Sequence, residues 1–137
     1  MKTIITVETI ITSNIDIVWN TFISPKHIKK WHTASPEWHT TKAENNLIKG
    51  GGFSSRMEAK DGSFAFDFGG VYDKIITNQL ISYTLDDGRS VSITFTKKDN
   101  TVLITEAFEP ENQNPVNMQK QGWQAILDNF KKYVETV

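Results

Sequence analysis

The chain has 137 residues, of which 38% are hydrophobic and 23% charged, and this predicts one folded domain over residues 1–137. Its 15 basic and 16 acidic residues give a net charge of −1, so it lacks the basic excess that nucleic-acid binding requires. The absence of cysteine excludes disulfides, thiolate metal sites and cysteine nucleophiles.

The sequence also bears on where the chain resides. None of its apolar runs approaches the roughly 20 residues that span a bilayer, so no membrane insertion is expected. The first 14 residues hold one lysine, and threonines and Glu8 interrupt their apolar side chains. They are therefore typical of a strand and not of a signal peptide. We expect a cytoplasmic protein.

The N-terminal part of the chain predicts a strand followed by two short helices. Residues 3–12 are rich in Ile, Val and Thr, a composition that favours a strand. Over residues 15–23 the apolar side chains recur at helical spacing, and a serine and a proline start a second short helix over residues 24–32. A proline and small polar residues favour a loop over residues 33–41.

From Lys42 to Glu109 the apolar pattern changes to a period of two. Apolar and polar residues alternate, and turn sequences at residues 61–62, 86–89 and 98–100 interrupt the alternation. Successive hairpins of this kind predict an antiparallel sheet of about six strands in this region, with one apolar and one polar face.

The last element is a helix. Asn114 and Pro115 are typical of a helix start, and apolar residues recur mostly at steps of three and four from Val116 to Val137, over about 22 residues. The order of elements predicts an α+β fold in which one long amphipathic helix covers the apolar face of an antiparallel sheet.

Large aromatic side chains dominate the predicted apolar face. A single helix against a bent sheet leaves a gap, and aromatic walls with a few polar groups are typical of small-molecule pockets. A solid core filled by the same rings is the other interpretation, and periodicity alone leaves both open. The aromatic residues in this register are Phe53, Phe64, Phe66, Phe68, Tyr72, Tyr83, Phe95 and Phe108.

The three histidines, His27, His32 and His39, lie in one short window together with Trp31 and Trp38. Their spacings do not place two histidines on one helix face one turn apart, and a zinc site needs three or four convergent ligands, so no metal site is predicted. The loop in this window forms either the rim of a cavity or an ordinary exposed loop.

Glu106 is the most unusual residue of the predicted sheet, because it occupies the apolar register of its strand. A buried carboxylate costs several kcal/mol unless it is paired or protonated. It is then a ligand contact or a general base with a raised pKa. A bulge, or exposure near the end of the strand, is the other interpretation. The Gly-x-Ser-x-Gly motif of serine hydrolases is absent, and no residue is assigned as catalytic.

A set of motifs resembles a known family along essentially the whole chain. The motifs are Val18-Trp19, Trp31, Gly51-Gly52-Phe53, Met57, Phe68-Gly69-Gly70-Val71-Tyr72, the segment from Tyr83 to Arg89, Gly122-Trp123 and Leu127. In this order and spacing they resemble the heat-shock-protein-90 ATPase activator-like family, within the START-like, birch-pollen-allergen-like (SRPBCC) superfamily.

The resemblance implies the helix-grip fold, a curved seven-stranded antiparallel sheet around a long C-terminal helix, with two short helices between strands 1 and 2 and an enclosed cavity. Members of this superfamily often bind lipids, sterols, polyketides or other hydrophobic ligands, and some are enzymes. The resemblance transfers no catalytic residue. It covers only one domain of the eukaryotic co-chaperones after which the family is named, so a chaperone partner is not the leading expectation.

The leading hypothesis is a binding domain for a small hydrophobic molecule, without a cofactor, acting as a monomer or a homodimer. The ligand is expected between the sheet and the last helix, with Trp31 and Trp38 at the entrance. The further residues expected to contact it are Phe53, Met57, Phe66, Phe68, Tyr72, Tyr83, Phe95, Glu106, Phe108, Met118 and Trp123.

Two alternatives remain. The first is an enzyme that acts on a cyclic or polyketide-like substrate in the same cavity, with Glu106 or His39 as acid or base; we expect binding rather than catalysis. The second is a chaperone-interaction module, which needs an exposed apolar patch of more than a few hundred Å². The outward-facing residues of the predicted strands are polar and do not favour it.

Overall fold

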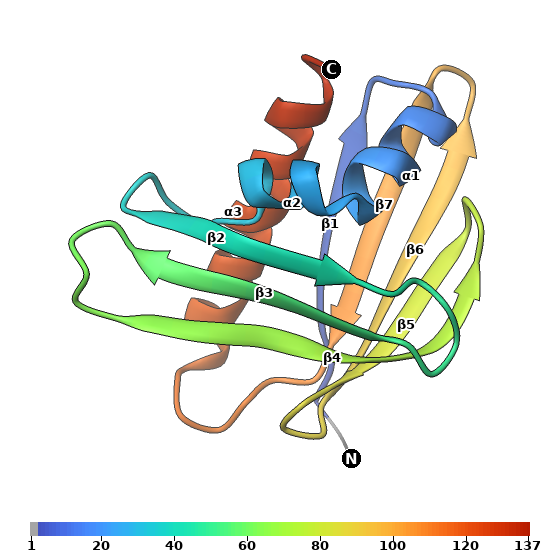
Figure 1. The fold of residues 1–137 in the computed structure, drawn as a ribbon. Helices are drawn as coiled ribbons and strands as arrows, with labels where there is room; N and C mark the ends of the chain where they lie inside the picture. The colour runs from blue at the N-terminus through green and yellow to red at the C-terminus, as the bar shows by residue number, and fades with distance from the viewer. Residues whose placement is uncertain (1–2) are drawn as a thin grey trace.

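The protein folds as a curved antiparallel sheet around a long C-terminal helix (Figure 1). The structure is a computed structural model and describes residues 3–137. The sheet has seven strands in the order β1-β7-β6-β5-β4-β3-β2. In chain order the elements are β1 (Ile5–Ile11), α1 (Ile15–Ile23), α2 (Pro25–Trp31), β2 (Trp38–Asn45), β3 (Gly52–Ala59), β4 (Ala65–Ile76), β5 (Leu80–Leu85), β6 (Ser90–Lys98), β7 (Thr101–Phe108) and α3 (Val116–Val134).

The predicted architecture is confirmed: an α+β fold with seven antiparallel strands, a long C-terminal helix and two short helices between the first two strands. Helix α1 begins where Asn14 caps it, its side-chain oxygen accepting a hydrogen bond of 2.9 Å from the amide of Ile17. Helix α2 begins with Pro25 in its first turn. The Ser24 hydroxyl does not cap α2; it donates to the side-chain oxygen of Asn20 in α1.

The three predicted turns join successive strands. Gly62 and Gly88 have φ values of 79° and 92°, and Asp99 has a φ of 53°, so each turn contains a residue in the left-handed region. Gly70 lies inside β4, where a Cβ atom would meet the carbonyl oxygen of Thr84 on β5. Glycine at this position lets β4 and β5 approach closely.

Two predicted boundaries were wrong. The expected loop over residues 33–41 ends early, because β2 already begins at Trp38. Trp38 pairs with Ala59, and a register shift between Thr40 and Lys42 interrupts the alternation that would have shown this strand. Helix α3 ends at Val134, three residues before the predicted end.

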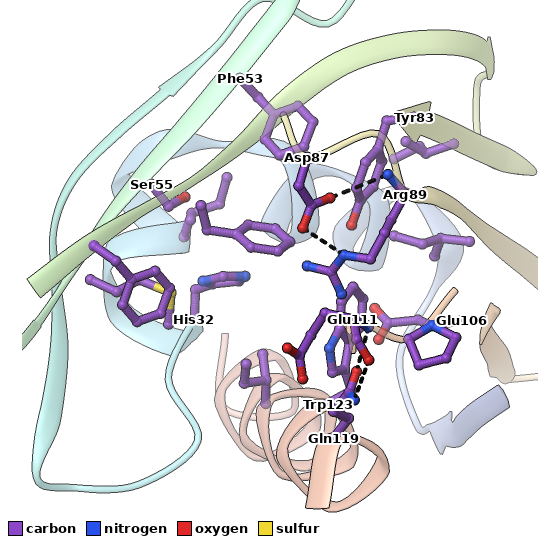
Figure 2. Close-up of a pocket in the computed structure, with 18 of the residues that line it drawn as sticks. His32, Phe53, Ser55, Tyr83, Asp87, Arg89, Glu106, Glu111, Gln119 and Trp123 are labelled. Carbon is purple, nitrogen blue, oxygen red and sulfur yellow. Dashed lines mark hydrogen bonds and ion pairs between the residues drawn. The ribbon is translucent and has the colours of Figure 1, made fainter. Parts of the chain in front are cut away.

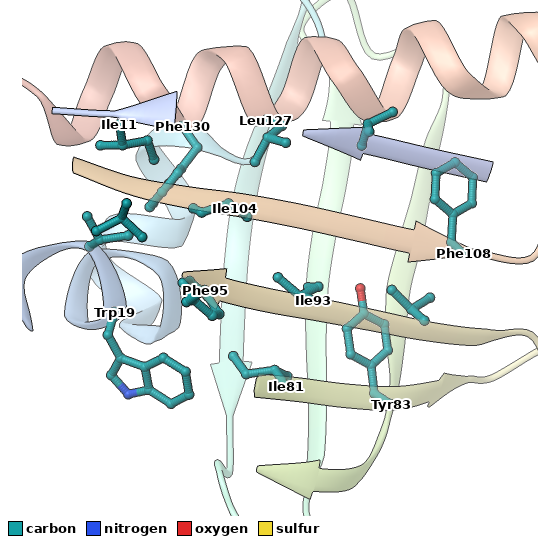
Figure 3. Packing of buried hydrophobic residues seen from close by; sticks show 14 of the residues in the cluster. Ile11, Trp19, Ile81, Tyr83, Ile93, Phe95, Ile104, Phe108, Leu127 and Phe130 are labelled. Atoms are coloured by element: carbon teal, nitrogen blue, oxygen red, sulfur yellow. The ribbon is translucent and has the colours of Figure 1, made fainter. Parts of the chain in front are cut away.

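The hydrophobic core lies between β1, β7 and β6 on one side and helices α1 and α3 on the other (Figure 3). Phe130 of α3 is 0% exposed, and its ring lies 4.7 Å from that of Trp31 and 5.1 Å from that of Phe22. The ring of Phe95 on β6 lies 5.1 Å from Trp19 of α1. Edge-on ring packing of this kind leaves this end of the sheet filled.

Helix α3 covers only part of the concave face. Among the described elements its extensive contacts are with β1, α2 and α1, rather than with β3, β4 or β5. The side chains on the concave face of those three strands therefore face a region where α3 does not pack directly on the sheet. Within residues 3–137, no helix combines the length and apolar character needed to cross a bilayer.

Candidate functional site

A pocket with a volume of about 860 Å³ lies between the concave face of the sheet and helices α2 and α3 (Figure 2). Strands β3 to β7 form one wall, α3 forms the second, and the end of α1 with α2 closes the third. The loops before β6 and α3 add polar residues. The residues that line it are Phe22, Ile23, Ile28, Trp31, His32, Asn45, Phe53, Ser55, Met57, Phe64, Phe66, Phe68, Tyr72, Ile81, Tyr83, Asp87, Arg89, Ile93, Glu106, Pro110, Glu111, Asn112, Gln113, Asn114, Gln119, Trp123 and Ile126.

A connected set of aromatic rings forms the apolar wall. The ring of Phe53 lies 4.7 Å from Tyr83 and 5.0 Å from Tyr72, so three neighbouring strands present their rings together. Phe68 lies 6.0 Å from Trp123 of α3, and this pair bridges sheet and helix. Such walls suit an apolar or aromatic ligand because they exclude water and offer ring faces.

Asn45 fixes the corner where α1 approaches the sheet. The Tyr72 hydroxyl donates to the side-chain oxygen of Asn45 at 2.6 Å, and the Asn45 amide donates to the carbonyl of Ile23 at 2.7 Å. Burial raises the pKa of Tyr72, so its hydroxyl remains a protonated donor. These bonds hold the Tyr72 ring in the pocket wall.

Gln119 organises the loop that leads into α3. Its side-chain nitrogen donates to the carbonyls of Glu111 at 3.0 Å and Asn114 at 2.8 Å, and its oxygen accepts from the Glu111 amide at 2.9 Å. Arg89 lies in the turn between β5 and β6, where its Nε donates to a carboxylate oxygen of Asp87 at 2.8 Å. The polar rim is therefore held in place by its own hydrogen bonds.

Glu106 is the only carboxyl group among the described residues that is buried, with 7% of the residue exposed. It lies in the apolar register of β7 with no bulge in the pairing of that strand, which excludes the interpretation that it escapes to solvent. No described residue forms a hydrogen bond or ion pair with it. Burial raises its pKa to about 8.

Tyr83 interacts electrostatically with Glu106. The pKa of Tyr83 is raised well above its usual value, first by burial and then by the charge of Glu106. Its ring packs on Phe53 and Tyr72, yet its hydroxyl has no hydrogen-bond partner among the described residues. Figure 2 shows both Tyr83 and Glu106 at the pocket. The mainly apolar site therefore contains two polar groups without a hydrogen-bond partner among the described residues.

His32 is the third polar group without a partner. Its Nδ1 atom is buried and makes no hydrogen bond within residues 3–137. Burial lowers the pKa of His32 to about 4, so the ring is neutral at pH 7. The ring lies 5.4 Å from Phe68 and takes part in the aromatic wall.

The predicted ligand contacts divide into two groups. Those whose side chains line the pocket are Trp31, Phe53, Met57, Phe66, Phe68, Tyr72, Tyr83, Glu106 and Trp123. Those that lie outside its lining are Trp38, Phe95, Phe108 and Met118.

The four residues outside the lining have identifiable reasons for their position. Phe95 and Phe108 point from β6 and β7 into the filled core, and Phe108 stacks on Trp123 at 3.9 Å, so that Trp123 separates it from the pocket. Met118 is 57% exposed on α3. Trp38 packs 5.8 Å from Phe66 and 6.1 Å from Phe64, beside the pocket rather than in it.

Sequence reasoning missed most of the polar rim. Asp87, Arg89 and residues 110–114 lie in turns and loops, where no periodicity indicates direction. Gln119 could have been found, because it shares one helix face with Trp123 and Ile126 through steps of four and three.

The three histidines do not converge. The Nδ1 atom of His27 lies 2.7 Å from the Tyr133 hydroxyl, His32 lines the pocket, and His39 is exposed on β2. Within residues 3–137, no three His, Asp or Glu side chains gather as metal ligands would.

A seven-stranded curved sheet around a long C-terminal helix, with two short helices after the first strand, is the helix-grip arrangement of the START-like (SRPBCC) superfamily. Residues 12–135 match the family model described as "Activator of Hsp90 ATPase homolog 1-like protein". The chain belongs to this family. The fold is one that commonly binds hydrophobic ligands.

Several solved structures are similar. The AHSA1-like protein from Aeromonas hydrophila is 39% identical, with 98% of this chain and 93% of that chain covered and a TM-score of 0.92. A protein from Cytophaga hutchinsonii is 53% identical, with 96% and 92% covered and a TM-score of 0.84. A Chromobacterium violaceum protein shares the fold at 20% identity, with 97% and 98% covered and a TM-score of 0.87. A search of curated proteins found no match.

Proposed function

We propose that this protein binds a small, mainly hydrophobic molecule in the pocket between the sheet and helix α3. The observation that carries the proposal is the pocket itself: about 860 Å³, with aromatic rings from β3, β4, β5 and α3 around it. This volume lies within the range of natural small-molecule sites, which are apolar with a few placed polar groups. Phe53, Phe68 and Trp123 supply the apolar contacts, and Glu106 and Tyr83 supply the polar ones.

The mouth of this pocket supports the proposal. Phe64 is 60% exposed and Phe66 is also exposed, although both line the pocket. When a ligand covers apolar rings that are otherwise in water at the edge of a cavity, the free energy of the complex is lowered. Trp38 contacts both rings and extends this aromatic edge, which is the entrance role proposed for it.

The experiment is a titration with N-phenyl-1-naphthylamine, a neutral apolar dye that fluoresces when it leaves water. We expect saturable binding of one dye per chain. Ile126→Trp places an indole into the pocket from α3 and is expected to weaken binding by about tenfold or more, because overfilling removes the space. Val71→Trp adds the same ring to the exposed outer face of β4 and serves as the matched control.

Equal affinity of the Ile126→Trp and Val71→Trp proteins would place the dye elsewhere and contradict the proposal. Absence of saturable binding to the unmodified chain would do the same. Native mass spectrometry of gently purified protein, offered lipid extracts, then identifies what the pocket retains.

The enzymatic alternative has one specific observation in its favour, a buried Glu106 in the pocket. Catalysis needs a second group aligned with it, and no described side chain is hydrogen-bonded to Glu106. The chaperone alternative depends on an apolar outer surface, whereas the outward residues of β6, such as Thr94 and Thr96, are polar. The geometry therefore supports binding above either alternative.

A further inference from the structure

The charges that line the pocket are unbalanced. Asp87, Glu106 and Glu111 are acidic, whereas Arg89 is the basic residue of the lining and His32 is neutral at pH 7. Arg89 is already engaged, since its Nε lies 2.8 Å from Asp87 and its Nη1 donates to the carbonyl of Glu109 at 3.4 Å. Glu106 is therefore left without a cation among the described residues.

Glu106 shares the pocket with aromatic rings whose faces favour a positive charge. Phe108 follows it by two residues on the same face of β7, and Trp123 stacks on Phe108 at 3.9 Å. The Tyr83 ring approaches from β5. The faces of Trp and Tyr rings carry negative potential and attract cations, and this attraction is stronger where water is excluded. A carboxyl group and aromatic rings thus line the same pocket.

We propose that the natural ligand is a hydrophobic amine, whose protonated nitrogen pairs with the carboxylate of Glu106 while its apolar body lies along Phe68 and Trp123. The inference rests on the proposed binding function and names the ligand class for that same site. An ammonium group supplies the charge that Glu106 lacks and can donate hydrogen bonds to it.

Other ligand classes fit the charge pattern less well. A carboxylate ligand would meet Asp87, Glu106 and Glu111, and like charges at close range cost free energy. A neutral alcohol or ketone would leave Glu106 protonated and would gain one neutral hydrogen bond, which is weaker than a charge-assisted one. An amine is the ligand class whose positive charge compensates the desolvation cost of the buried carboxylate.

The proposal fixes the direction of the pH dependence. The charged and polar groups that line the pocket with Glu106 include Tyr83 from β5, Asp87 and Arg89 from the β5–β6 turn, Glu111 from the loop before α3, and the neutral His32 and Gln119. In the empty pocket the pKa of Glu106 is raised to about 8 by burial. Binding of an ammonium then releases a proton below that pH, so affinity rises by about tenfold per pH unit as the pH approaches 8.

The test uses three probes with one ten-carbon body: decylammonium, decanol and decanoate, each below its aggregation concentration. Each displaces N-phenyl-1-naphthylamine from the pocket between pH 6 and 8, where an alkyl amine, like lysine, stays protonated. We expect decylammonium to bind best at pH 8, decanoate worst, and only decylammonium to gain affinity with rising pH.

Two variants locate the effect. Glu106→Gln keeps the shape and removes the charge, so we expect decylammonium to lose about tenfold or more in affinity at pH 8 while decanol is unchanged. Glu8→Gln, an exposed carboxylate on the outward side of the neighbouring strand β1, is the control and is expected to change neither.

The outcomes separate the inference from the function on which it rests. Decanol or decanoate binding at least as well as decylammonium at pH 8, with the dye still lost in Ile126→Trp, overturns the amine assignment and keeps the binding function. A pH-independent decylammonium affinity in the unmodified chain overturns the assignment without needing any variant. Failure of all three probes and of the dye overturns both.

Discussion

The two ends of the concave face carry the same kind of side chain, yet one end is solid and the other is hollow. At the solid end, the ring of Phe130 lies 4.7 Å from that of Trp31 and is fully buried against helices α1 and α2. At the hollow end, Phe68 reaches Trp123 at 6.0 Å and remains partly exposed to the pocket. Aromatic content therefore does not decide whether a region of this sheet is filled.

The position of helix α3 makes the difference. Its C-terminal half lies against β1, α1 and α2, where the short helices fill the remaining space with Trp19, Phe22 and Trp31. Toward its N-terminal half, Gln119 is committed to holding the loop before the helix, and no short helix covers β3 and β4 there. The pocket is a consequence of where α1 and α2 end.

The largest effect is expected from deleting a ring at the solid end. Phe130→Ala removes a fully buried side chain and should lower the free energy of unfolding by about 3–5 kcal/mol, since the packed neighbours cannot close the void. Phe68→Ala removes the same atoms beside an existing pocket and should cost about 1–2 kcal/mol. Urea unfolding of both proteins measures the difference.

Equal losses in the two variants would show that the hollow end is packed as tightly as the solid end. The slopes of the two unfolding transitions provide the control. If they match that of the unmodified protein, the comparison concerns the folded state rather than the compactness of the unfolded chain.

Glu106 gives the second effect, because it makes the hollow end sensitive to pH. Its pKa is about 8 in the folded protein against an ordinary value of 4.5, so the folded state holds the proton more tightly. The contribution of Glu106 to stability is then greatest below pH 4.5 and falls as the pH rises toward 8. Glu106→Gln removes this titration, and at pH 9 it should exceed the unmodified protein in stability by about 2–4 kcal/mol.

The measurement is a series of denaturation midpoints between pH 5 and 9 for the Glu106→Gln, Glu8→Gln and unmodified proteins. The Glu8→Gln curve should run parallel to that of the unmodified protein, because Glu8 is exposed. If the Glu106→Gln curve is also parallel, the Glu106 carboxyl of the unmodified protein is solvated or paired. A buried charge would then not distinguish the hollow end from the solid end.

The sequence predicted the fold because each element carries a local signal. Alternation marked the strands, positive-φ turn residues such as Gly62, Gly88 and Asp99 marked the hairpins, and the cap at Asn14 marked α1. Strand β2 was seen only in part, because the register shift after Thr40 breaks its period. Boundaries failed where the local signal was interrupted.

Only part of the pocket lining could be predicted from the sequence, for a related reason. Alternation shows which face of a strand is apolar, but Phe53 and Phe95 share that face and differ only in what lies above them. The covering helices come from distant parts of the chain, and no spacing encodes their distance from a given ring. Register alone likewise left two interpretations of Glu106, which the continuous pairing of β7 with β1 and β6 resolves.

The smallest effect on stability is expected at the mouth of the hollow end, where it tests function most directly. Phe64 is 60% exposed, so Phe64→Ser should change the free energy of unfolding by no more than about 0.5 kcal/mol. The ring nevertheless lines the pocket and should be covered when a ligand enters, so affinity for N-phenyl-1-naphthylamine should fall by about two- to fivefold. Val71→Ser removes an exposed apolar side chain from the outer face of β4, the strand that Phe64 precedes, and should change neither quantity. A dye affinity that falls equally in both variants would mean that the mouth has no special role. A fall confined to Phe64→Ser, at unchanged stability, would show that ligands pass or rest at this edge of the hollow end.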